Sequence, residues 1–83
     1  MTYVYLLESA AIRQQRYIGA TGDLKRRLRE HNEGKSVHTR KYRPWRLVAY
    51  FAFADEVMAL RFERYLKSGS GHAFAKRHFL RCL

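Results

Sequence analysis

Residues 16–32 read RYIGATGDLKRRLREHN and decide the fold, because they combine a short strand, a glycine turn and a helix. We expect the strand to end at Tyr17–Gly19. The turn is expected over Gly19–Gly22, where glycine accepts backbone angles that a β-carbon forbids. Thr21 or Asp23 should cap the helix that follows, and an acidic residue at this end also suits the helix dipole.

The helix predicted for the second half of this stretch has a mixed inner face. At about 100° per residue, Leu24 and Leu28 form its buried stripe. Arg27 and His31 lie beside that stripe and are predicted to point towards the sheet. Two roles are compatible with this placement. The two side chains can be semi-buried structural residues with satisfied polar ends, or they can face a functional site.

Thr2–Leu7 is predicted to be a first strand with apolar residues on both faces, which indicates a strand covered on both sides. We expect it to pair antiparallel with the strand that ends at Tyr17–Gly19, so that Tyr5 and Tyr17 come close on one face. Such an aromatic pair is a common packing unit. A phenol with a lowered pKa could also pass a proton during hydrolysis.

The segment from residue 35 to residue 46, KSVHTRKYRPWR, is basic and aromatic, and Pro44 argues against a helix there. We predict a loop that binds a nucleic-acid backbone, since cationic side chains contact phosphates and aromatic rings stack on bases. The alternative is a solvated loop whose Trp45 belongs to the core. The predicted binding residues are Lys35, Arg40, Lys41 and Arg43.

Arg46–Phe53 is the most apolar run of the chain, and we expect the central strand there. Asp55 then begins a helix in which Glu63 and Lys67 stand four residues apart, the spacing of a helical ion pair. An ordinary pair is the simpler interpretation. A carboxylate that edges towards the sheet would also suit a metal ion.

The last part of the chain is predicted to complete the core. Ser68–Gly71 is expected to be a tight turn, and His72–Leu80 a final helix. The helix that precedes this turn has a second apolar side, formed by Val57 and Leu60. We expect the final helix to cover it.

The composition favours a small cytoplasmic protein with a polyanionic partner. Its 83 residues are expected to form one domain, residues 1–83, and 17 Lys and Arg against 7 Asp and Glu give a net charge of +10. This charge favours DNA, RNA or an acidic membrane surface. The single cysteine, Cys82, excludes an internal disulfide and a cysteine zinc site, and we expect it to be an exposed tail residue. Without a signal peptide or an apolar run of membrane length, no membrane insertion is expected.

An ordered set of motifs is spread over the chain: Tyr3-Val4-Tyr5, Tyr17-Ile18-Gly19, Arg27, His31-Asn32, Glu63 and then Lys67. The set resembles the GIY-YIG nuclease family, and most of all its small, single-domain bacterial members. The likeness extends from Tyr3 to about Phe79, and its longest block is YIGxTxDLxxRLxxHN. Two positions depart from the family pattern. Tyr3-Val4 replaces Gly-Ile, and Ala75-Lys76 stands where larger members place an asparagine.

This resemblance implies an α/β (α+β) fold with a small three-stranded, mostly antiparallel sheet flanked by helices. It implies a metal-dependent endonuclease that hydrolyses DNA phosphodiester bonds with low intrinsic sequence specificity, in DNA repair or recombination. RNA is an open alternative to DNA, and a non-catalytic nucleic-acid-binding protein with the same fold is the rival function. Because no recognition domain is added, a protein partner would supply specificity. The oligomeric state is left open.

The resemblance also implies which side chains bind charge. Glu63 would coordinate one divalent ion, magnesium with manganese as the alternative, and a site with one protein carboxylate would be weak without DNA. Arg27 would bind the scissile phosphate through its planar guanidinium. Lys67 would add a further phosphate contact.

Proton transfer is assigned to the remaining matching residues. Tyr17 or Tyr5 would orient or deprotonate the attacking water, and the sequence does not decide which tyrosine is the base. His31 would assist the proton transfer or hold Tyr5 in place.

Overall fold

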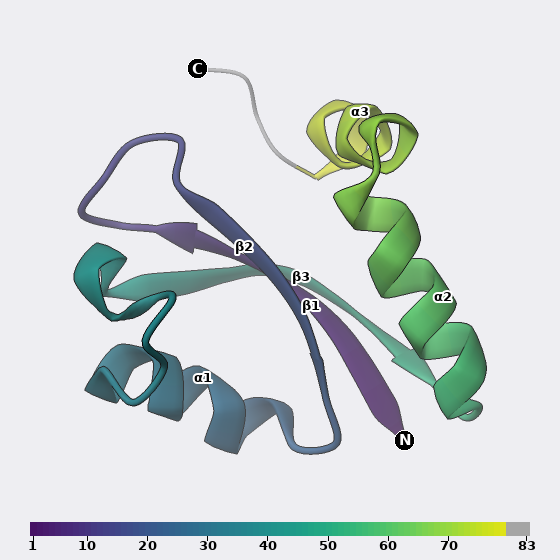
Figure 1. Cartoon of the computed structure of the whole chain (residues 1–83), viewed down its shortest axis with the longest axis horizontal. Coiled ribbons are helices and arrows are strands. Elements are labelled where there is room, and N and C mark those ends of the chain that lie inside the picture. Colours follow the sequence, from purple (N-terminus) through teal and green to yellow (C-terminus); the bar gives the residue numbers. More distant parts are fainter. Residues whose placement is uncertain (80–83) are drawn as a thin grey trace.

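The chain forms one antiparallel three-stranded sheet with helices on both faces, which confirms the predicted class. The structure is a computed structural model that describes residues 1–79. Its strands are β1 (Thr2–Ser9), β2 (Arg16–Thr21) and β3 (Trp45–Phe53). Figure 1 shows α1 on one side of the sheet and α2 and α3 on the other. The helices are α1 (Leu24–Glu33), α2 (Glu56–Lys67) and α3 (Gly69–His78), with a 3-10 turn η1 (Arg40–Tyr42) before β3.

The central strand is β1, so the prediction of a central third strand is wrong. The strand order is β2-β1-β3, and Tyr5 pairs with Gly19 on one side and with Tyr50 on the other. Four consecutive β1 residues, from 4 to 7, are at most 1% exposed, as a strand covered on both faces requires. Strand β3 lies at an edge and leaves Leu47 and Tyr50 partly in solvent. An apolar run therefore did not identify the middle of the sheet.

Alternating β1 residues build two separate cores. Val4 and Leu6 pack under α2 and α3, whereas Tyr5 and Leu7 pack with Trp45 on the α1 side. Trp45 is only 5% exposed, and its indole N–H donates a hydrogen bond to the Thr39 carbonyl at 2.9 Å. The alternative interpretation of Trp45 as a core residue is therefore confirmed.

Helix α1 begins and ends as its sequence predicts. The Asp23 carboxylate accepts a hydrogen bond from the Arg26 N–H, and Gly34 closes the helix in the left-handed region at φ 81°. The predicted turn at Gly19 is wrong, because β2 continues through Gly19 to Thr21. Gly19 is a strand residue, and its lack of a side chain has a different cause, described below.

Helix α3 begins earlier than predicted, because Ser68 ends α2 and its hydroxyl also accepts the Gly71 N–H as the cap of α3. The predicted tight turn is therefore the first turn of a helix. Phe74 of α3 packs on Tyr65, so Val57 and Leu60 stay exposed (59% and 44%) and the predicted covering of them is wrong. Predictions were also made for Leu80 and Cys82, but both lie outside the described residues. Within residues 1–79, every helix is too short or too polar to cross a lipid bilayer.

Candidate active site

The phenol of Tyr5 crosses directly over Gly19 of the neighbouring strand. The two residues are register partners in the sheet. A β-carbon on Gly19 would stand 2.5 Å from the Tyr5 hydroxyl and 3.0 Å from the Tyr17 ring. Glycine is needed here for a close approach and not for a turn.

A buried chain of hydrogen bonds extends from Tyr5 to the segment after α1. The Tyr5 hydroxyl lies 2.9 Å from Nε2 of His31, and Nδ1 of His31 lies 2.7 Å from Oγ1 of Thr39. All three residues are at most 1% exposed. His31 therefore holds Tyr5, as one of its two predicted roles requires. Thr39 was missed, because a lone threonine in a basic segment has no periodic signal.

Burial keeps both ionisable groups of this chain neutral. Desolvation raises the pKa of the Tyr5 phenol to about 12. The Arg27 guanidinium lowers this pKa, whereas the charges of Tyr17 and Glu63 raise it. Desolvation also lowers the pKa of His31, with the Arg27 charge as the next cause. The pKa of Tyr5 is therefore shifted in the direction opposite to the one that would make its phenol a stronger acid.

Tyr17 completes an aromatic cluster at the outer strand β2. Its ring centroid lies 6.2 Å from that of Tyr5 and 5.0 Å from that of His31. The predicted approach of the two tyrosines is confirmed. Tyr17 is only partly buried, so it stands between the buried Tyr5–His31 pair and solvent.

Arg27 leaves α1 beside this cluster and is held by a carboxylate of its own helix. Its Nη1 donates to Glu30 at 3.0 Å, and its side chain is 35% exposed. The Glu30 carboxylate raises the pKa of Arg27, and Arg27 in turn lowers the pKa of Glu30. The guanidinium is thus fixed near Tyr5 with part of its surface open to an anion.

Glu63 belongs to α2, on the opposite side of the sheet from Arg27. Its carboxylate accepts a hydrogen bond from Lys67 at 3.0 Å, which confirms the helical ion pair, and its side chain is 20% exposed. Its charge is the smallest of the causes that raise the pKa of Tyr5. Within residues 1–79, groups of three or more His, Cys, Asp or Glu that could hold a metal do not occur. A single carboxylate fits Mg²⁺ bound largely by water and substrate phosphate.

The predicted nucleic-acid-binding residues fall into two places. Lys67 belongs to α2, whereas the others follow α1 on the opposite side of the sheet (Figure 1). There, Lys35 pairs with Glu33 at 3.3 Å, and the Arg43 guanidinium occupies the space that a side chain on Gly34 would need. The residues of this second group are exposed: Lys35, Arg40, Lys41 and Arg43.

Asn32 was also missed as a structural residue. Its side-chain amide donates to the Trp45 carbonyl at 3.1 Å and accepts the Trp45 N–H. This double hydrogen bond ties the end of α1 to the start of β3. It therefore fixes the helix that carries Arg27 and His31 to the sheet that carries Tyr5.

Replacing Thr39 with valine tests the buried hydrogen-bond chain. Thr39→Val keeps the shape but leaves Nδ1 of His31 without its partner, so we expect the free energy of unfolding to fall by about 1–3 kcal/mol. Urea denaturation measures this change. Thr39→Ser retains the hydroxyl and should recover most of the loss. A Thr39→Val protein as stable as the parent would contradict the role of this bond.

The lowered pKa of His31 predicts a pH dependence of stability. Below the ordinary histidine pKa of about 6.5, the unfolded chain binds a proton at His31 that the folded chain does not bind. The free energy of unfolding should therefore decrease as the pH falls from about 6.5 towards the lowered pKa. Urea titrations above and below this window, with His31→Gln, should show a flatter curve for the variant. His72→Gln, at an exposed position, should keep the original slope.

Comparison with known proteins places the chain in a family. Residues 1–77 match the GIY-YIG catalytic domain. The solution NMR structure of the UPF0213 protein BH0048 from Bacillus halodurans is similar, with a TM-score of 0.54 and 37% identity over 89% of this chain and 81% of that one. The structure-specific endonuclease subunits SLX1 of Candida dubliniensis and Scheffersomyces stipitis are 40% and 39% identical over 90% of this chain.

The similarity covers most of this chain but only a small part of the SLX1 subunits. The chain spans 27% and 23% of their lengths, about a quarter of each. Residues 1–77, which match the family domain, include Tyr5, Arg27 and Glu63. With the family domain matched over residues 1–77, the chain belongs to the GIY-YIG family.

Proposed function

We propose that the chain is a divalent-metal-dependent endonuclease domain that hydrolyses DNA with low intrinsic sequence specificity. The observation that carries this proposal is the buried hydrogen-bond chain of Tyr5, His31 and Thr39, which lies in the domain matched to the GIY-YIG family. The partly exposed Arg27 on α1 and Glu63 on α2 supply the charged groups. An arginine alone would serve a nucleic-acid binder. A carboxylate at the same site would repel phosphate, and metal-assisted hydrolysis would explain its presence.

The chain's own residues would divide the reaction between phosphate binding and proton transfer. Arg27 would exchange Glu30 for the scissile phosphate and stabilise the extra negative charge. Tyr17, at the solvent side, would orient the water. In the tautomer that donates from Nδ1 to Thr39, the neutral His31 accepts at Nε2, so the Tyr5 hydroxyl can receive the water's proton while its own proton passes to His31. The raised pKa of Tyr5 supports such a coupled transfer over a standing phenolate.

Glu63 would hold one Mg²⁺, with Mn²⁺ as a substitute, in a shell completed by water and the substrate phosphate. A bound ion supplies polarisation of the phosphate and charge stabilisation for the leaving oxygen. Lys67 would remain close to Glu63 as a phosphate contact, and the exposed cations between residues 35 and 43 would bind the DNA backbone.

The substrate and partner follow from the relatives and from the charge. The relatives are named as subunits of structure-specific endonucleases, which supports branched DNA as substrate and a partner that supplies specificity. The net charge of +10 supports binding to any nucleic-acid backbone. Residues 1–83 would act as one nuclease domain, and its location in the cytoplasm stays a prediction.

The test is cleavage of supercoiled plasmid and of branched and single-stranded DNA, with Mg²⁺ or Mn²⁺ and with EDTA as control. Tyr17→Phe runs beside the parent chain and is expected to lose most of the activity, since it removes the group that orients the water. Nicking that depends on metal and falls in Tyr17→Phe supports the proposal. Nicking of equal rate in both proteins indicates a contaminant. Salt-sensitive binding without cleavage of any substrate favours the rival, non-catalytic function.

A further inference from the structure

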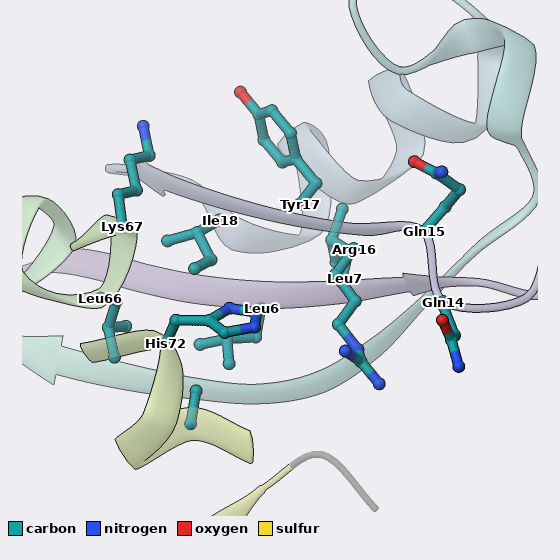
Figure 2. A pocket seen from close by; sticks show the side chains of 11 residues that line it. Leu6, Leu7, Gln14, Gln15, Arg16, Tyr17, Ile18, Leu66, Lys67 and His72 are labelled. Carbon is teal, nitrogen blue, oxygen red and sulfur yellow. The ribbon is translucent and has the colours of Figure 1, made fainter. Parts of the chain in front are cut away.

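A cleft of about 400 Å³ lies along β2, next to the candidate active site. Figure 2 shows that Arg16 and Tyr17, neighbours in this strand, leave it in opposite directions, while Lys67 at the end of α2 points the same way as Tyr17. Tyr17 and Lys67 both line the cleft and both belong to the candidate site. The cleft therefore shares two residues with that site.

The walls of the cleft combine apolar and cationic groups. Leu6, Ile18 and Leu66 line it as apolar residues, and Arg16 and His72 line it as basic residues. In Figure 2 the His72 ring reaches over Leu6. Among the described residues that line the cleft, none is acidic. This combination selects an anion that also carries an apolar portion.

Arg16 is partly buried, and one nitrogen of its guanidinium is shielded without a partner among the described residues. Its Nε is shielded from solvent and has no hydrogen-bond partner within residues 1–79. The carboxylate opposite it in the sheet, Glu8, lies 2.8 Å from Arg46 instead. A shielded N–H without an acceptor is unfavourable, so Arg16 is suited to bind an acceptor group such as a phosphate oxygen.

We propose that this cleft binds a single nucleotide of the substrate strand next to the scissile phosphate, with its phosphate on Arg16 and His72 and its sugar against the apolar wall. The inference rests on the proposed nuclease function, because it places this nucleotide beside Tyr17 and Lys67. The volume lies within the range of about 300–1,000 Å³ usual for small-molecule sites, and it holds one nucleotide but no duplex. The phosphate contacts are those that cationic side chains make with nucleic acids.

Binding without turnover is the first test. A labelled strand of about ten thymidines is titrated in EDTA with the parent chain, Arg16→Gln and His72→Gln. The matched control is Arg61→Gln, which removes the same charge from an exposed residue of α2 outside the cleft. Arg16→Gln should weaken binding about tenfold and lower the salt slope by about one. The surface variant His72→Gln should weaken it more than Arg61→Gln. Equal weakening by Arg16→Gln and Arg61→Gln overturns the proposal.

NMR spectra of the Arg16 Nε–H and the His72 ring give the second test. Thymidine 5′-monophosphate should shift both signals at a lower concentration than inorganic phosphate, and thymidine should leave Arg16 unchanged. Equal response to phosphate and nucleotide overturns the assignment of a nucleotide. If the chain shows these shifts but cleaves no DNA, the proposed nuclease function is ruled out, and the cleft remains a nucleotide-binding site. If the chain cleaves DNA but shows no such shifts, only the proposed nucleotide site in the cleft is ruled out.

Discussion

Glu63→Gln is expected to lower metal-dependent DNA cleavage about 10³-fold, because charge stabilisation by a bound ion contributes several kcal/mol and each 1.4 kcal/mol is about tenfold in rate. The amide keeps the size of the side chain but removes the carboxylate proposed to hold the ion. Loss of the ion pair with Lys67 should cost about 0.5 kcal/mol or less, so the fold survives. Single-turnover cleavage with saturating Mg²⁺ measures the change.

The matched control for this prediction is Glu56→Gln, which removes one carboxylate from the exposed first turn of the same helix. It should cleave DNA at nearly the parent rate. Glu63→Gln should bind DNA at least as tightly as the parent chain, since a negative charge near the phosphate is gone. Cleavage at the parent rate by Glu63→Gln would remove Glu63 from the site.

Gly19→Ala should lower cleavage about 10²-fold, the size of effect expected for a displacement of about 1 Å in a catalytic group. The new methyl would meet the Tyr5 hydroxyl at 2.5 Å and its ring carbon Cζ at 2.7 Å, so the phenol must move away from His31. The displaced ring should also lower the free energy of unfolding by about 1–3 kcal/mol, as overpacking usually does. Cleavage rates and urea denaturation together separate the two effects.

Gly22→Ala is the control, because a β-carbon there meets no atom within 4 Å and the residue does not require a positive φ. It should change neither the cleavage rate nor the stability appreciably. The Tyr5 hydroxyl signal by NMR should move in Gly19→Ala and stay in Gly22→Ala. An active Gly19→Ala protein with an unchanged Tyr5–His31 bond would show that the close approach has no functional role.

Local patterns predicted the elements of this fold well. The cap and left-handed glycine of α1 are set by backbone chemistry, so Gly34 was identified correctly and Asp23 was one of the two caps proposed. The inner face of α1 followed from helical spacing, and His31 is indeed buried. The approach of Tyr5 and Tyr17 followed from antiparallel pairing, because strand alternation fixes which side chains share a face.

Tertiary relations could not be obtained in this way. The apolar run in β3 suggested a central strand, but position in a sheet depends on pairing partners and not on the strand's own composition. Gly19 has the sequence signature of a turn, but a glycine is required there because the phenol of Tyr5 leaves no room for a side chain. Thr39 and Arg16 had no local signal, since their importance arises from groups far away in the chain or from a missing partner.

The central place of β1 also bears on the order in which the chain can fold during synthesis. The hairpin of β1 and β2 can form early, because its register pairs lie close in the sequence. Strand β1 can pair with β3 only after β3 has been synthesised, since Thr2 pairs with Phe53. Until then the nascent hairpin presents an unpaired inner edge, the kind of edge that promotes association between chains. We therefore expect aggregation during slow translation to be most sensitive to changes in β1.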